Sequence, residues 1–199
     1  MINAAGANLI SKSESIRLKA YFCPAGVPTI GRGHTKGITS QMVRDGYTIT
    51  VEQEQQLFTQ DMQEWEADVR RLLKRTPNEN QLAAMISLAF NIGLQGFSTS
   101  SVLKAFERGD DQAAYRAFAL WNKITDPVTK RKVISNGLCI RRAKEAALYL
   151  TPVAAGDGIR SLVDMPQEVE APKTMTESTI NRAGIIAGGT TAVAAVSEV

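Results

Sequence analysis

The sequence predicts a mainly helical α+β protein in which a small N-terminal lobe containing β-strands is joined by a long helix to a larger helical C-terminal lobe. Residues 20–35 hold three glycines and two prolines, which break helices and favour short strands joined by turns. Residues 51–75 place apolar side chains at three- and four-residue spacing, as a long amphipathic helix requires, and Pro77 ends it. Further helical patterns then follow up to residue 150.

The N-terminal lobe is expected to contain two short helices and a bent hairpin. Residues 8–19 fit a short amphipathic helix around Glu14, although imperfectly. Residues 20–35 fit short strands, and residues 39–46 fit a helix that a glycine stops. Thr50 is the expected N-cap of the long helix, because its hydroxyl can accept a hydrogen bond from the first turn.

The C-terminal lobe is expected to consist of four helices. Residues 78–92 are apolar nearly all round and predict a buried helix that ends at Asn91-Ile92-Gly93. Residues 99–107 and 110–122 predict two shorter helices, and residues 138–150 predict the last one. Residues 123–137 are basic and rich in turn formers, so we expect a loop there.

The length of 199 residues allows one domain, residues 1–151, followed by a linker and tail, residues 152–199. The domain holds 20 Lys and Arg against 14 Asp and Glu, whereas the tail holds 3 against 6. A basic body suits an anionic polymer such as bacterial cell wall or nucleic acid, although it can also serve only solubility. Without a helix-turn-helix or RNA-binding motif, no nucleic-acid partner is expected.

Cysteine and histidine are too scarce for a disulfide framework or a zinc site. The chain has Cys23, Cys139 and the single histidine His34. Two cysteines do not make a disulfide scaffold, and structural zinc needs four ligands of these types. We therefore expect no metal and no cofactor.

The tail has two parts with different expectations. Residues 152–178 resemble a flexible linker, and residues 183–197 are small, apolar and uncharged. The second segment is shorter than the ~20 residues that span a bilayer, which favours a disordered Ala/Gly tail. Its Gly184-xxx-Gly188 spacing is a helix-packing pattern in membranes, so membrane contact stays open. The N-terminus lacks the pattern of a cleavable signal peptide.

Glu14 is the candidate for acid–base chemistry. Hydrolysis of a glycosidic bond needs one carboxylic acid to protonate the leaving oxygen and a second group on the opposite face of the sugar. Glu14 is the only acidic residue before Asp45, and Arg17 lies three residues further on. Composition alone does not assign this role, because a lone Glu on a helix is usually a surface group.

The stretch from Glu14 to Thr35 resembles the active-site signature of the phage lysozymes of glycoside hydrolase family 24. In that family a Glu is followed nine residues later by Asp or Cys and six after that by Thr, which here gives Glu14, Cys23 and Thr29 ahead of the segment TIGRGHT. Residues 88–101 and 137–145 resemble two later blocks of the same family. The resemblance covers about residues 8–150.

The resemblance implies a lysozyme-like fold and a muramidase. The activity would be that of an endolysin, which hydrolyses the β-1,4 bond between N-acetylmuramic acid and N-acetylglucosamine in peptidoglycan during host-cell lysis. Glu14 would be the general acid, and Thr29 would bind the catalytic water or stabilise the intermediate. Cys23 would be a thiolate base, a nucleophile, a group that orients water, or a packing residue. The alternative is a non-catalytic or virion-attached peptidoglycan-binding module.

Other residues receive binding or structural roles from the same resemblance. Thr35, Phe90 and Ser100 align with positions that contact the sugar, although Phe90 also suits the core. His34 is expected to hold the hairpin against the long helix through Asp61 or Glu64. The group Arg141, Arg142 and Glu145 is expected to form an ion-pair network, with contact to wall carboxylates as the alternative.

The resemblance also implies a place of action and marks departures from the family. The protein would be a monomer, made in the host cytoplasm and acting on the cell wall in the periplasm after release. Four positions differ from the family's usual residues. Before and after Glu14 the family usually has an apolar residue and Gly, whereas this chain has Ser13 and Ser15. Pro28 replaces an aromatic residue, and Arg32 replaces Tyr. Because these residues surround Glu14, we expect the departures to affect the rate of catalysis more than the fold.

Overall fold

The structure is a computed structural model that describes residues 2–126 and 128–153. These residues lie in one compact unit, Met1–Gly158. The predicted linker and tail, apart from residues 152 and 153, fall outside the described residues, so the expectations for them remain predictions.

The small lobe contains a two-stranded antiparallel sheet and a short helix. Strand β1 (Arg17–Phe22) pairs with β2 (Pro28–Gly31), with an irregular register between Arg17 and Tyr21, and helix α2 (Ser40–Arg44) follows. Ala20, Ile30 and Ile49 form a separate small core. This hairpin and α2 agree with the sequence prediction.

The predicted helix over residues 8–19 is wrong beyond its first half. Helix α1 spans Ala4–Ser13, and the backbone of Glu14 is already extended, with φ −116° and ψ 139°. Leu18 and Ala20 alternate toward the small core, a period of two that suits a strand. Burial of these two side chains therefore favours strand β1, although the local spacing of apolar residues suggested a helix.

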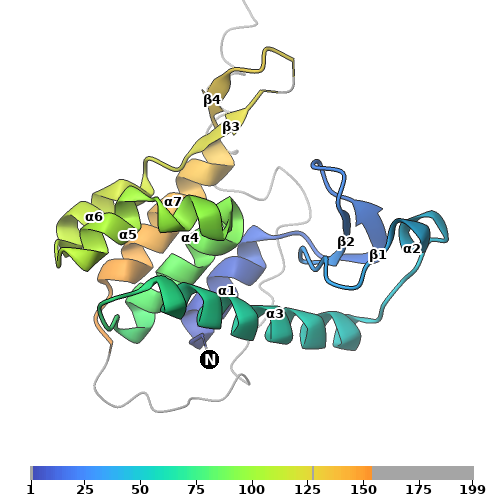
Figure 1. The fold of residues 1–199 in the computed structure, drawn as a ribbon, viewed down its shortest axis with the longest axis horizontal. Helices are drawn as coiled ribbons and strands as arrows, with labels where there is room; N and C mark the ends of the chain where they lie inside the picture. The colour runs from blue at the N-terminus through green and yellow to red at the C-terminus, as the bar shows by residue number, and fades with distance from the viewer. Residues whose placement is uncertain (1, 127, 154–199) are drawn as a thin grey trace, which may run out of the picture. The chain divides into compact units, whose positions relative to one another are not determined.

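Helix α3 (Val51–Leu72) connects the two lobes, as predicted (Figure 1). Thr50 caps its first turn in a capping box with Gln53. Leu57, in the first half, packs against the small core, whereas Met62 and Val69 lie in the large one. One helix therefore contributes apolar side chains to both lobes.

The large lobe is built from helices α4 (Glu79–Ser98), α5 (Ser101–Glu107), α6 (Asp111–Phe118) and α7 (Asn136–Leu150). Helix α4 is buried over residues 80–89 and at Phe97, and it packs against α1, α3, α5 and α7. It breaks at Gly93, at φ 79°, which favours glycine. The helical turn then resumes to Ser98, beyond the predicted end. Helix α6 stops at Phe118, four residues earlier than predicted.

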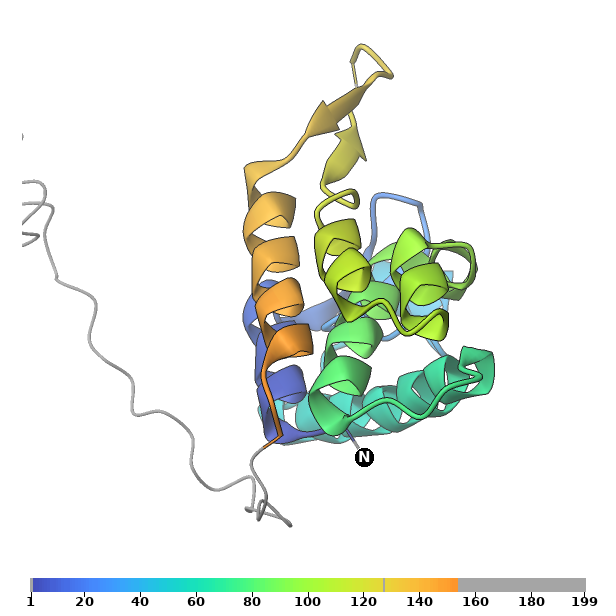
Figure 2. The same ribbon diagram turned by 90° about the vertical axis from the view of Figure 1, so that its left-hand side faces the viewer.

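The segment predicted as a loop contains a second hairpin. Strand β3 (Lys123–Thr125) pairs antiparallel with β4 (Lys132–Ile134), and all six residues are exposed. Figures 1 and 2 show this hairpin projecting from the helical lobe beside the start of α7. Across the described ranges no single helix is long and apolar enough to cross a membrane. Helices α4 and α5 together have the length and composition of a membrane span, but the pair is bent by 77°.

Candidate active site

Glu14 lies directly after α1, where the chain turns from helix to strand. Its carboxylate oxygen Oε1 accepts a hydrogen bond from Nη1 of Arg141 on α7, at 2.5 Å. The Glu14 side chain is 27% exposed, whereas that of Arg141 is only 7% exposed. The carboxyl group is therefore fixed from the interior while one side remains open to solvent.

A buried ion-pair network holds Arg141 in place, as the sequence predicted for this group. Arg141 Nε and Arg142 Nη2 both donate to Oε1 of Glu145, at 3.1 and 2.8 Å. Ser87 of α4 donates its hydroxyl to the same oxygen at 2.6 Å, and its carbonyl accepts from Arg141 Nη2 at 3.2 Å. The network ties α4 and α7 together and positions Glu14 through one guanidinium.

Glu14 lines a pocket of about 460 Å³ between the end of α1 and the β1–β2 hairpin. The guanidinium of Arg17 stacks on the ring of Tyr21, 4.4 Å from its centre. Burial raises the pKa of Tyr21 above its ordinary value, while Arg17 acts in the opposite direction. Tyr21 is therefore a neutral phenol at neutral pH and can donate or accept a hydrogen bond. The remaining lining residues are Ser13, Ser15, Phe22, Pro24, Arg32 and Gly33.

Arg32 fixes the hairpin to α3 at the edge of this pocket. Its guanidinium lies 3.2 Å from the buried carboxylate of Glu54 and stacks on Phe58 at 4.6 Å. Gly31, just before it, has φ +63°, and a Cβ there would lie 3.1 Å from Cγ of Glu54. Glycine at 31 is therefore required both by its conformation and by the close approach of Glu54.

Cys23 directly follows β1 at the turn of the hairpin, and Thr29 lies in β2 just after that turn. Hydrogen bonds from the backbone N–H groups of Val27 and Ala25 lower the pKa of the Cys23 thiol, with a smaller contribution from the Thr29 hydroxyl. Thr29 is buried, and its hydroxyl donates to the carbonyl of Val27 at 2.8 Å. The thiol and the hydroxyl are thus neighbours, although neither belongs to the described lining of the Glu14 pocket.

Tyr21 links these two groups of residues. Tyr21 lines the pocket together with Glu14 and lies on β1 two residues before Cys23, and the charges of both groups raise its pKa. Tyr21 was missed because residues 17–19 were assigned to the predicted helix, which hid that Tyr21 belongs to a strand beginning at Arg17. On a strand, residues 17 and 21 share one face, and a period of two starting at Arg17 would have found it.

His34 has the structural role that was predicted for it. Its Nδ1 lies 2.9 Å from Oδ1 of Asp61 on α3, and its Nε2 lies 2.8 Å from the carbonyl oxygen of Lys36. The second predicted partner, Glu64, instead pairs with the Lys36 ammonium at 2.8 Å. Together these contacts hold the segment after β2 against the connecting helix.

The three residues expected to contact sugar differ in their accessibility. Phe90 is partly buried, packs edge-on against Trp65 at 5.5 Å, and lies next to Gly33 of the pocket. Thr35 is exposed. Ser100 is 1% exposed, and its hydroxyl caps α5 by accepting from the N–H of Leu103. Their contact with sugar stays a prediction.

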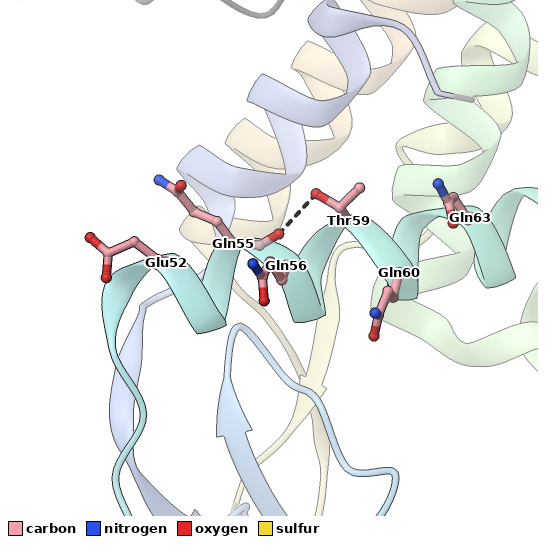
Figure 3. A pocket seen from close by; sticks show the side chains of 6 residues that line it. All are labelled: Glu52, Gln55, Gln56, Thr59, Gln60 and Gln63. Atoms are coloured by element: carbon pink, nitrogen blue, oxygen red, sulfur yellow. Dashed lines mark hydrogen bonds between the residues drawn. The ribbon is translucent and has the colours of Figure 1, made fainter.

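A second hollow, of about 410 Å³, lies along the outer face of α3 (Figure 3). Its lining comes from a single helix and consists of Glu52, Gln55, Gln56, Thr59, Gln60 and Gln63. The Thr59 hydroxyl bonds to the Gln55 carbonyl of its own helix at 2.8 Å. Its one carboxyl group, that of Glu52, is exposed, and hydrogen bonds from its own backbone and from Thr50 lower its pKa. Such a carboxylate stays ionised and is a poor general acid, so the pocket at Glu14 is the candidate active site. Among the described residues, no group of three or more His, Cys, Asp and Glu could hold a metal ion.

Comparisons with known proteins agree with this arrangement. The profile of the phage lysozyme family matches residues 11–145. The endolysin of Salmonella phage P22 is 40% identical over 152 residues, which cover 75% of this chain and 98% of the endolysin. A mutant of P22 lysozyme has a similar structure, with a TM-score of 0.61 and 37% identity over 76% of this chain and 99% of that one. The muramidase domain of SpmX from Asticaccaulis excentricus gives a TM-score of 0.68 at 31% identity, covering 76% and 99%.

Two lobes joined by one helix, with a fixed glutamate in the pocket beside the hairpin, define a lysozyme-type glycoside hydrolase. The family match extends over more than half of the chain and includes Cys23, Thr29 and the Glu145 network. This chain belongs to the phage lysozyme family.

Proposed function

We propose that this chain is an endolysin muramidase that cleaves the β-1,4 bond between N-acetylmuramic acid and N-acetylglucosamine in peptidoglycan, with Glu14 as its general acid. The observation that carries the proposal is the position of Glu14. Its carboxyl group is held by Arg141 on the interior side and lines the pocket on the other. A carboxyl group fixed in a partly buried site is what protonation of a glycosidic oxygen requires.

The reaction follows from that position. The proton of Glu14 passes to the glycosidic oxygen while the bond from that oxygen to C1 of the muramic acid breaks and positive charge develops on C1. A water molecule attacks C1, its proton leaves to a base, and the sugar gains a hydroxyl at C1. The carboxylate left on Glu14 is stabilised by the Arg141 guanidinium, which is already within hydrogen-bond distance.

Thr29 and Cys23 are proposed to act on the water or on the intermediate. Hydrogen bonds from Val27 and Ala25 lower the thiol pKa, which increases the thiolate fraction at neutral pH and supports Cys23 as a base or nucleophile. The hydroxyl of Thr29, beside the thiol, supports a shared role in orienting water. Both roles agree with the positions of Cys23 and Thr29 in the family signature.

The surroundings of Glu14 suit a substrate that carries carboxylates. Arg17 lines the pocket with its guanidinium over Tyr21, and peptidoglycan bears carboxylates on its stem peptides. Thr35, Phe90 and Ser100 are proposed as further sugar contacts, Phe90 through its position beside Gly33. We further propose that the protein acts as a monomer on the cell wall after release from the host cytoplasm.

The decisive experiment compares Glu14→Gln with the wild type on purified peptidoglycan, with mass spectrometry of the products. The amide keeps the size of the side chain but cannot supply the proton, so turnover should fall by at least ~100-fold. Glu79→Gln, at an exposed position in the first turn of α4, is the matched control and should keep full activity. Reducing muramic-acid ends mean hydrolysis, anhydro ends mean a transglycosylase, and no product from the wild type means a binding module.

Cys23 variants separate its possible roles. If a charged group at this position takes part in the reaction, Cys23→Ser should lose most activity and Cys23→Asp should keep much of it. Equal rates for the wild type and both variants would assign the thiol to packing only.

A further inference from the structure

The β3–β4 hairpin and the residues beside it form an exposed surface, here called the hairpin surface. Residues 120–140 hold six of the large apolar side chains that the structure leaves exposed. Val128, at the tip, is 85% exposed, and Ile134 on β4 is 64% exposed. The six are Leu120, Ile124, Val128, Val133, Ile134 and Ile140.

The same surface is strongly basic. Lys123, Lys130, Arg131 and Lys132 are all exposed, and Asp126 is the only acidic residue between 120 and 140. The Asp126 carboxylate is already used inside the turn, where it accepts hydrogen bonds from the N–H groups of Val128 and Thr129. Four cations therefore stand beside the apolar side chains with little internal neutralisation.

Neither face of this hairpin is covered by the rest of the described chain. The register places Ile124 opposite Val133 on one face and Lys123 opposite Ile134 on the other, and all of these side chains are exposed. A two-stranded hairpin without a covered face is at best marginally stable in water. Figures 1 and 2 show it standing out from the helices, so a large flat partner can reach it without obstruction from α6 or α7.

We propose that the hairpin surface binds the surface of an anionic lipid bilayer. Cations beside a bilayer are attracted to acidic headgroups, and exposed aliphatic side chains gain by entering the interfacial region. A peptidoglycan strand would engage the cations through its carboxylates but would leave the aliphatic side chains in water. One face of the hairpin combines Lys123 and Lys132 with Ile134, and Val128 stands exposed at the tip. Cations and aliphatic side chains on one face favour lipid over cell wall. This property is additional to the proposed catalysis at Glu14.

The test measures co-sedimentation of the full chain with vesicles of phosphatidylcholine alone or mixed with phosphatidylglycerol. Wild type should bind the mixed vesicles, should not bind pure phosphatidylcholine, and should dissociate as salt is raised. The triple variant K130Q/R131Q/K132Q should bind about tenfold to a hundredfold more weakly. Val128→Ser should bind a few-fold more weakly, because its side chain no longer enters the interface.

The matched control is K74Q/K104Q/R116Q, which removes the same three charges from other exposed positions of the helical lobe. It should bind vesicles as the wild type does, and both triple variants should digest lipid-free peptidoglycan at the wild-type rate. Glu14→Gln should still bind vesicles, which separates this proposal from the catalytic one. Equal vesicle binding by the wild type and the hairpin variant K130Q/R131Q/K132Q overturns the proposal of lipid binding. A hairpin variant that loses only its binding to lipid-free peptidoglycan also overturns it and identifies the wall as the partner.

Discussion

The two hairpins among the described residues have the same topology but opposite environments. The β1–β2 hairpin buries Ala20 and Ile30 in a small core and is tied to α3 by Arg32 and His34. The β3–β4 hairpin is exposed along both strands. The first carries Cys23 and Thr29 and borders the Glu14 pocket, and such residues need fixed positions. The difference shows that the first hairpin is attached to the rest of the molecule by side-chain burial and ion pairs, which strand pairing by itself does not supply.

The largest expected effect is on the core of the first hairpin. Ile30→Ala removes a fully buried side chain and should lower the free energy of unfolding by about 2–4 kcal/mol. Ile134→Ala, the matched change on β4, should stay within about 0.5 kcal/mol because that side chain is already in water. Urea unfolding of both variants measures the difference, and similar losses would contradict the contrast between the hairpins.

Backbone conformation should sharpen the same contrast. Residue 31 has φ +63°, and Gly31→Ala would place a Cβ against Glu54. The substitution should lower the free energy of unfolding by about 1–3 kcal/mol. Lys130, in the turn of the second hairpin, already has φ +56° without being glycine. Lys130→Gly removes that strain but gives the unfolded chain more conformational freedom. The free energy of unfolding should therefore change by less than about 1 kcal/mol. Thermal unfolding compares the two, and a tolerated Gly31→Ala would refute the close packing against α3.

The turn of the first hairpin should be chemically distinctive as well as rigid. Because hydrogen bonds from Val27 and Ala25 lower the Cys23 pKa, more thiolate is present at neutral pH than in a free thiol. In a Cys139→Ser background, alkylation by iodoacetamide should reach half of its maximal rate at a lower pH than alkylation of free cysteine. A midpoint at or above that of free cysteine would show that the turn does not stabilise the thiolate.

The smallest effect is expected from removing the second hairpin. The N–H of Ser135 bonds to the carbonyl of Asn122 at 2.9 Å, so these residues already form the base of the hairpin. Replacing residues 123–134 by Asn-Gly should close that base with a two-residue turn and change stability by less than about 1 kcal/mol. Differential scanning calorimetry is the measurement. A large loss would mean that the hairpin supports α7 and is more than an appended surface.

Much of the fold followed from local patterns in the sequence. The apolar spacing of residues 51–75 and the cap at Thr50 predicted α3, and the glycines and prolines of residues 20–35 predicted the first hairpin. The second hairpin was missed because its strands are only three residues long and lack a buried alternating face. Residues 8–19 were misread because β1 is selected by burial of Leu18 and Ala20 against residues 30 and 49, which are distant in sequence.

The sequence by itself determined the connecting helix, the buried helix α4 and the Glu14, Cys23 and Thr29 spacing, because these depend on periodicity and on order along the chain. Only the tertiary structure decided how Glu14 is held, since its partner Arg141 is 127 residues away and is itself fixed by Ser87 and Glu145. It also decided that Tyr21 and Arg32 border the same pocket. The physical reason is that burial and ion pairing join residues from separate elements, which spacing along the chain does not encode.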